Sequence, residues 1–134
     1  MLRNVVRIVA ICFVAVLAAC SGTTAGDPRV LELKTQNDSG VTGTVTLTSA
    51  GETRTVVEVA VVPNGHPNMP GHVHPGTCAD PVPQPMFPLE NVLDGVSRTE
   101  IPISLADLRA EAVSVNLHHS NEEMRISVAC VDVD

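Results

Sequence analysis

The sequence has almost no aromatic side chains. Among its 134 residues there is no tryptophan and no tyrosine, and the only phenylalanines are Phe13 and Phe87. Proteins that bind single-stranded nucleic acid need aromatic rings on which bases stack. The formal net charge of −7 would also repel a phosphate backbone. The composition therefore argues against nucleic acid as a partner, and it leaves a metal, a protein or a small uncharged ligand.

The N-terminus is typical of a secretory signal peptide, because two arginines precede an apolar run over residues 8–19 that is too short to span a bilayer. The run ends in Leu-Ala-Ala-Cys at 17–20, which resembles a bacterial lipobox. We therefore expect residues 1–19 to be a lipoprotein signal peptide and residues 20–28 to be a lipidated Cys20 with a short tether. The protein would then be anchored in a bacterial membrane, on the extracytoplasmic side of the cell envelope. The alternative is an ordinary signal peptide cleaved nearby, with Cys20 incidental.

Processing at Cys20 would leave two cysteines free to form one disulfide. The mature chain would have 115 residues (134 less the first 19) and a net charge of −9, since two of the eight basic residues leave with the signal. Cys12 is lost and Cys20 carries the lipid, so Cys78 and Cys130 remain in an oxidising compartment. Their disulfide would close a loop of about fifty residues, a constraint of roughly 4 kcal/mol on the unfolded chain. Two free buried thiols are the alternative.

Beyond the tether, apolar and polar residues alternate with the period of two that is typical of β-strands. The alternating segments are 31–34, 41–48, 55–61, 96–103, 113–118 and 124–131. The single helical candidate is 104–109, for which Ser104 is a suitable N-cap. We expect residues 29–134 to form one all-β domain, an antiparallel sandwich or barrel of about seven to eight strands.

Eight prolines fall within residues 63–88. Because proline cannot donate a hydrogen bond to a sheet ladder, we expect this segment to be a long loop. Long irregular segments inside compact domains are usually functional. The loop could receive a protein partner, with Met86 and Phe87 as its apolar tip.

Histidine is the residue type that points to chemistry. On a strand, His72 and His74 would point to the same face, so two imidazoles could meet one ion while Val73 points into the core. His118 could supply a third ligand if its strand lies beside this pair, and imidazole suits copper and zinc. Strand alternation lets either His118 or His119 face the pair, but not both. A solvated His-x-His without a metal is the alternative.

The remaining histidine, His66, is expected to be an ordinary loop residue, and His119 an ordinary turn residue if His118 is the ligand.

A set of these residues resembles the copper–zinc superoxide dismutases: Gly71-His72-Val73-His74, Gly76, Cys78, His118 and Val128-Ala129-Cys130-Val131. The resemblance covers most of residues 29–134. It implies a Greek-key β-barrel, copper bound by His72, His74 and His118, and a disulfide between Cys78 and Cys130.

The sequence also departs from that family. Residues 79–117 contain no histidine, so the resemblance implies that the zinc site is absent. Ser127 stands where the family has an arginine that attracts superoxide, and Arg125, expected on the same strand face, could partly replace it.

We therefore expect a lipid-anchored, extracytoplasmic copper-binding protein, with superoxide dismutase activity left open. The alternative is a non-catalytic binding or structural module without metal. The sequence is similar to chordin-type domains, which also have a His-x-His segment and a later Asn-x-His, here Asn116-Leu117-His118.

Overall fold

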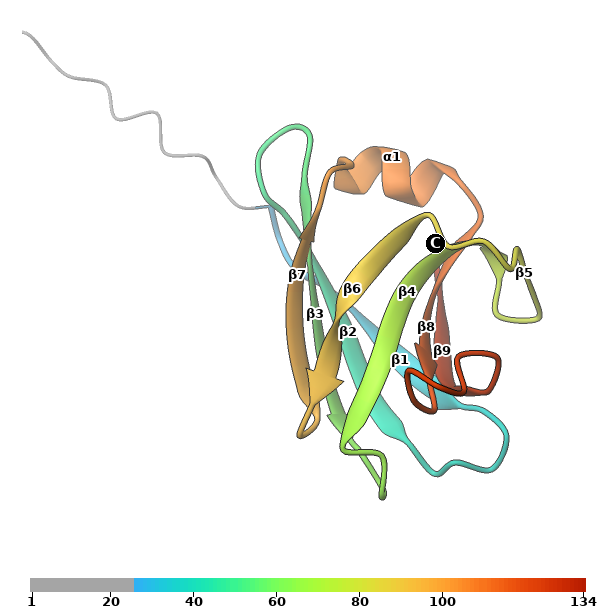
Figure 1. Cartoon of the computed structure of the whole chain (residues 1–134). Helices are drawn as coiled ribbons and strands as arrows, with labels where there is room; N and C mark the ends of the chain where they lie inside the picture. The colour runs from blue at the N-terminus through green and yellow to red at the C-terminus, as the bar shows by residue number, and fades with distance from the viewer. Residues whose placement is uncertain (1–25) are drawn as a thin grey trace, which may run out of the picture.

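Eight antiparallel strands close on themselves to form a β-barrel in the part of the chain that the computed structural model describes, residues 26–134 (Figure 1). The strands are β1 (Arg29–Thr35), β2 (Thr42–Ser49), β3 (Thr55–Val62), β4 (Asn68–Thr77), β6 (Phe87–Leu93), β7 (Val96–Ile101), β8 (Val113–His118) and β9 (Ser127–Val133). A two-residue strand, β5 (Asp80–Pro81), pairs only with the end of β4.

The barrel order is β4-β6-β7-β3-β2-β1-β9-β8, and pairing of β8 with β4 closes it. The chain crosses the barrel between β3 and β4 and again between β7 and β8, which is a Greek-key arrangement. The expected all-β fold is confirmed. The predicted signal peptide and Cys20 lie outside the described residues. Within residues 26–134, no helix combines the length and the apolar character that a membrane crossing needs.

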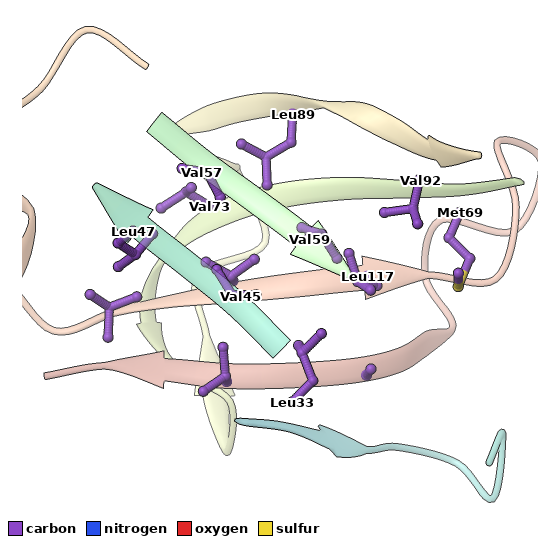
Figure 2. Close-up of a cluster of buried hydrophobic side chains, with 14 of the residues drawn as sticks. Leu33, Val45, Leu47, Val57, Val59, Met69, Val73, Leu89, Val92 and Leu117 are labelled. Atoms are coloured by element: carbon purple, nitrogen blue, oxygen red, sulfur yellow. The ribbon is translucent and has the colours of Figure 1, made fainter. Parts of the chain in front are cut away.

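The core consists of aliphatic side chains from all sides of the barrel (Figure 2). Val73 is fully buried there, as predicted for the residue between the two histidines. Phe87 is only half-buried and packs against the outside of this cluster. The expectation that Phe87 forms an exposed loop tip is therefore wrong.

The proline-rich segment contains all of β4, all of β5 and the start of β6, so the expectation of a long loop is wrong. Two of the prolines in β4 lie at points where the sheet ladder is irregular or ends. Pro70 falls at a register irregularity between Met69 and Gly71. Pro75 lies at the last pair of the β4–β8 ladder, and its carbonyl accepts a hydrogen bond from the Val82 N–H at 2.8 Å.

The last strand begins later than its alternating pattern indicates. Residues 124–126 form a turn, and β9 starts only at Ser127. Met124 and Ile126 are exposed, although their spacing matches the buried residues that follow. Arg125 was expected on the same strand face as Ser127. This expectation is wrong, because Arg125 lies in the turn that precedes β9.

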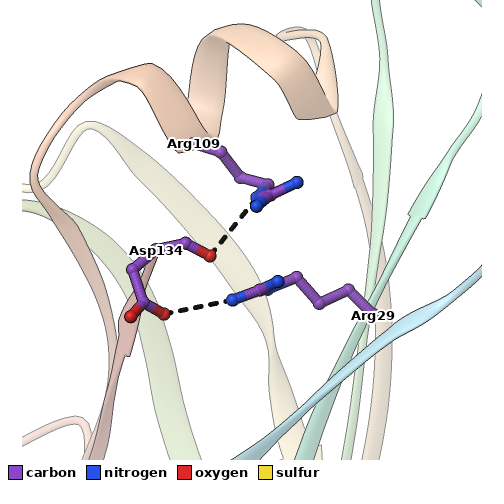
Figure 3. A network of polar contacts seen from close by, with 3 residues as sticks. All are labelled: Arg29, Arg109 and Asp134. Carbon is purple, nitrogen blue, oxygen red and sulfur yellow. Dashed lines mark hydrogen bonds and ion pairs between the residues drawn. The ribbon is translucent and has the colours of Figure 1, made fainter.

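The predicted helix is confirmed as α1 (Leu105–Ala110), which covers one end of the barrel with the fully buried Leu108. The Ser104 hydroxyl accepts a hydrogen bond from the Asp107 N–H at 3.0 Å, as an N-cap should. Asp134 joins this helix to the barrel (Figure 3). Its backbone oxygen accepts from Arg109 Nε at 3.3 Å, and its carboxylate accepts from Arg29 at 3.2 Å.

Candidate metal centre

Three histidines from two neighbouring strands converge on one point. His72 and His74 lie on β4, His118 ends β8, and the two strands pair with His72 opposite Asn116. One nitrogen of each ring lies within 4.8 Å of the other two. A point therefore exists within about 2.8 Å of all three nitrogens, which is 4.8 Å divided by the square root of three. Small ring rotations would bring them to the 2.0–2.1 Å typical of metal–imidazole bonds.

The structure places His118 against the pair, a choice that strand alternation left open. The β8–β9 ladder shifts register here, because Leu117 pairs with Ala129 while His118 pairs with Ser127, leaving Val128 as a bulge. His119 continues past the end of β8, and its ring lies against His66 with 4.9 Å between ring centroids. Neither His66 nor His119 joins the three-histidine group.

Hydrogen bonding prepares His74 to bind a metal. Its Nδ1 lies 2.8 Å from the Val82 carbonyl oxygen, which can only accept, so Nδ1 carries the proton. The opposite nitrogen, Nε2, is then an unprotonated lone-pair donor. A hydrogen bond from the non-coordinating nitrogen is the usual way in which proteins orient a metal-binding histidine. The role of Val82 had no signal in the sequence, because any residue provides a backbone carbonyl.

Buried imidazole nitrogens without partners are the second sign of a metal site. Within the described residues, His74 Nε2 and both ring nitrogens of His118 are buried and have no hydrogen-bond partner. Unsatisfied buried polar groups are rare and costly, and a bound ion would give a partner to His74 Nε2 and to one ring nitrogen of His118.

Burial also favours the neutral form of His118 and His72. It lowers the pKa of His118 to about 4, helped by the neighbouring His72 and His74. The Met124 backbone carbonyl faces the ring and opposes part of this change, although its geometry falls short of a full hydrogen bond. Burial, and then the charge of His74, lowers the pKa of His72 as well. Neutral imidazoles are the form that binds metals.

The site opens on one side to a surface cleft of about 450 Å³. The cleft is lined by His74, Pro81, Val82, Pro83, Asn116, His118, Met124 and Arg125. An ion held by three imidazoles would therefore have a coordination position that solvent or a small ligand can reach, which is the arrangement of catalytic rather than purely structural sites.

The predicted cysteine pair is at disulfide geometry. The Cys78 and Cys130 sulfurs are 2.07 Å apart and the Cα atoms 5.9 Å apart. The bond fastens the segment that follows β4 to the middle of β9, and the Cys78 N–H donates to the Asp132 carboxylate at 2.6 Å. Because this segment carries the Val82 carbonyl, the disulfide also fixes the group that orients His74.

Comparisons with models of protein families, with curated proteins and with solved structures found no match to this chain. The case for a metal site therefore rests on its own geometry, in which His72, His74 and His118 form a potential three-imidazole centre.

Proposed function

We propose that the protein binds copper through His72, His74 and His118, in an extracytoplasmic domain anchored to a bacterial membrane by lipid on Cys20. The observation that carries the proposal is the convergence of three imidazoles. In two of them, His74 and His118, buried ring nitrogens have no hydrogen-bond partner. A solvated, metal-free His-x-His would instead have nitrogens that reach water.

The donor set favours copper among the biological metals. All three ligands are imidazoles, and carboxylates, which harder cations prefer, are absent from the group. For a given nitrogen site, divalent copper binds more tightly than zinc and the earlier metals of the row. The resemblance to copper–zinc superoxide dismutases points the same way, and the lack of histidine in residues 79–117 argues against a second, zinc-binding half.

Superoxide dismutation is the reaction to test. Bound copper would supply one-electron redox chemistry. The protein's own contribution would be to keep His72 and His118 neutral, to orient His74 through Val82 and to leave one side open to the cleft. Arg125 is the cation that lines this cleft and could attract a small anion. The acidic net charge of the whole chain works against that attraction.

The alternative is a non-catalytic binding or structural module on the same barrel, without metal. One contact favours it over an active dismutase. The Ser127 hydroxyl donates to the Asn116 side-chain oxygen, so the position that the family gives to an arginine is used for an internal hydrogen bond. A partner surface on residues 63–88 remains part of this alternative.

Metal titration separates the two functions. The purified protein, stripped with a chelator, is titrated with Cu(II), and we expect one tight equivalent that the double variant His72→Ala/His118→Ala loses. His119→Ala is the matched control, because it removes the next histidine along the chain and should keep that equivalent. Copper binding with no superoxide consumption would indicate a carrier, whereas no tight equivalent would support the metal-free module. Detergent phase partitioning of Cys20→Ser against the parent chain tests the lipid anchor.

A further inference from the structure

One wall of the cleft beside the three-histidine centre carries a methionine. Met124 lies in the turn between β8 and β9, and it lines the cleft together with His74 and His118. Met124 is 47% exposed, whereas Met69 is fully buried in the barrel core. The Met124 side chain is therefore not occupied by core packing and is available to a ligand that enters the cleft.

Hydrogen bonds hold the turn that carries Met124. The Ile126 N–H donates to the Glu123 carbonyl at 3.1 Å, and the His119 N–H donates to the Ile126 carbonyl at 2.9 Å. The Met124 backbone carbonyl faces the imidazole ring of His118. The backbone at Met124 is therefore held beside one of the proposed copper ligands.

The Met124 side chain has space on two sides. Besides the cleft, Met124 lines a neighbouring hollow of about 410 Å³, which the other residues of the same turn surround. Methionine is unbranched and has three rotatable side-chain bonds. Its side chain can therefore turn toward the histidines or away from them without a change in the backbone.

We propose that Met124 supplies a fourth, thioether ligand to the three-histidine centre and thereby adapts this centre to the cuprous ion. The inference rests on the proposed copper-binding function. Thioether sulfur is a soft donor that favours Cu(I), whereas imidazole serves several divalent metals. Three imidazoles leave one coordination position toward the cleft, where Met124 forms part of the wall.

The other side chains that line the cleft do not offer a soft donor. Two prolines and a valine have no side-chain donor atom, and Arg125 is itself a cation. The side-chain oxygen of Asn116 is a hard donor, and it already accepts a hydrogen bond from the Ser127 hydroxyl. Met124 is therefore the side chain in this cleft whose chemistry discriminates between cuprous and divalent ions.

Cuprous affinity in matched methionine variants tests the inference. The chelator-stripped full chain is titrated with Cu(I) without oxygen, against a competing cuprous chelator, and separately with Cu(II). Met124→Leu keeps an apolar side chain of similar size but removes the sulfur. We expect it to weaken Cu(I) binding at least about tenfold, because loss of even an indirect partner of a metal ligand usually costs that much. Cu(II) affinity should stay within about twofold, because imidazoles suffice for divalent copper.

Met86→Leu is the matched control, because Met86 is also exposed but does not line the cleft. It should leave both affinities unchanged. Silver ion, a soft cation with the charge of Cu(I) and no redox change, gives a second readout. On addition of Ag(I), we expect the NMR signal of the Met124 methyl group to shift and those of Met69 and Met86 to stay in place.

The outcomes separate this inference from the proposed function. An unaltered Cu(I) affinity in Met124→Leu, or an unmoved Met124 methyl signal, would overturn the thioether ligand while copper binding by the three histidines stands. Equal losses of Cu(I) and Cu(II) affinity in Met124→Leu would show a structural role and would also overturn it. If the parent protein binds neither ion, the proposed function fails and the inference fails with it.

Discussion

His74 of β4 is oriented by the backbone carbonyl of Val82, whose oxygen lies 2.8 Å from the imidazole Nδ1 atom. Val82 follows Cys78 by four residues, and the Cys78–Cys130 disulfide ties this segment to β9. The position of one proposed metal ligand thus depends on a covalent bond made outside the ligand set.

Removal of the disulfide should affect both stability and metal binding. We expect Cys78→Ser/Cys130→Ser to lower the free energy of unfolding by about 2–5 kcal/mol, because the unfolded chain is no longer constrained. Copper affinity should fall by roughly 10–100-fold, since the Val82 carbonyl is no longer held against His74. Urea unfolding and copper titration measure the two effects. If the folded double variant keeps the copper affinity of the parent protein, the disulfide does not position the metal ligands.

The metal-free protein should lose stability as the pH falls through the range of histidine titration. The pKa of His118 is lowered to about 4 in the folded state, whereas an unfolded histidine titrates near 6.5. Between these values the unfolded chain binds a proton that the folded protein does not, so acid favours unfolding; above about pH 6.5 the contribution is constant.

Urea midpoints at pH 7.5, 6 and 5 measure this effect. His118→Gln is the comparison, because it keeps a polar side chain but cannot titrate. If the urea midpoints of the parent protein and of His118→Gln change equally with pH over this range, His118 is not the group that causes the loss of stability in acid.

The residue between the two β4 ligands should contribute stability without determining the metal stoichiometry. Val73 is fully buried in the core, and Val73→Ala should cost about 2 kcal/mol of unfolding free energy through lost burial and a residual cavity. Val62→Ala, on the exposed side of β3, is the control and should change stability by less than about 0.5 kcal/mol. A loss of copper stoichiometry in a folded Val73→Ala protein would contradict this division of roles.

Phe87 distinguishes a structural role from a partner-binding role. It packs against the outside of the core, so Phe87→Ala should lower the unfolding free energy by about 2 kcal/mol, less than the 3–5 kcal/mol expected of a fully buried phenylalanine. Met86→Ala, at the more exposed neighbouring position, should have little effect. Thermal unfolding measures the difference. If Phe87→Ala is as stable as the parent protein, Phe87 has no structural role and the proposal of an apolar interaction surface at Met86 and Phe87 is supported again.

Local pattern predicted most of the barrel. The period of two located its main strands, and Ser104 with Asp107 located the one helix, because both signals arise from neighbours in the sequence. The pattern failed at Met124 and Ile126, whose alternation continues that of β9 although a turn holds them outside the barrel. It failed again over residues 63–88, where proline frequency indicated a loop although half of the prolines, among them Pro70 and Pro75, lie within strands.

The candidate site was predictable only in part for the same reason. The His72–His74 spacing is local, whereas the approach of His118 to this pair depends on the pairing of β8 with β4, two strands that are far apart in the sequence. The contact between His66 and His119 joins two loops that no short-range pattern relates, and these two residues were expected to be ordinary loop and turn residues.

The most direct test of the central claim is X-ray absorption at the copper edge on the protein loaded with one equivalent of Cu(II). We predict a first shell that contains three imidazole nitrogens, and a shell reduced in imidazole scattering in His72→Ala/His118→Ala. A first shell with fewer than two imidazoles in the parent protein, or a spectrum unchanged by the double substitution, would contradict the assignment of copper to His72, His74 and His118.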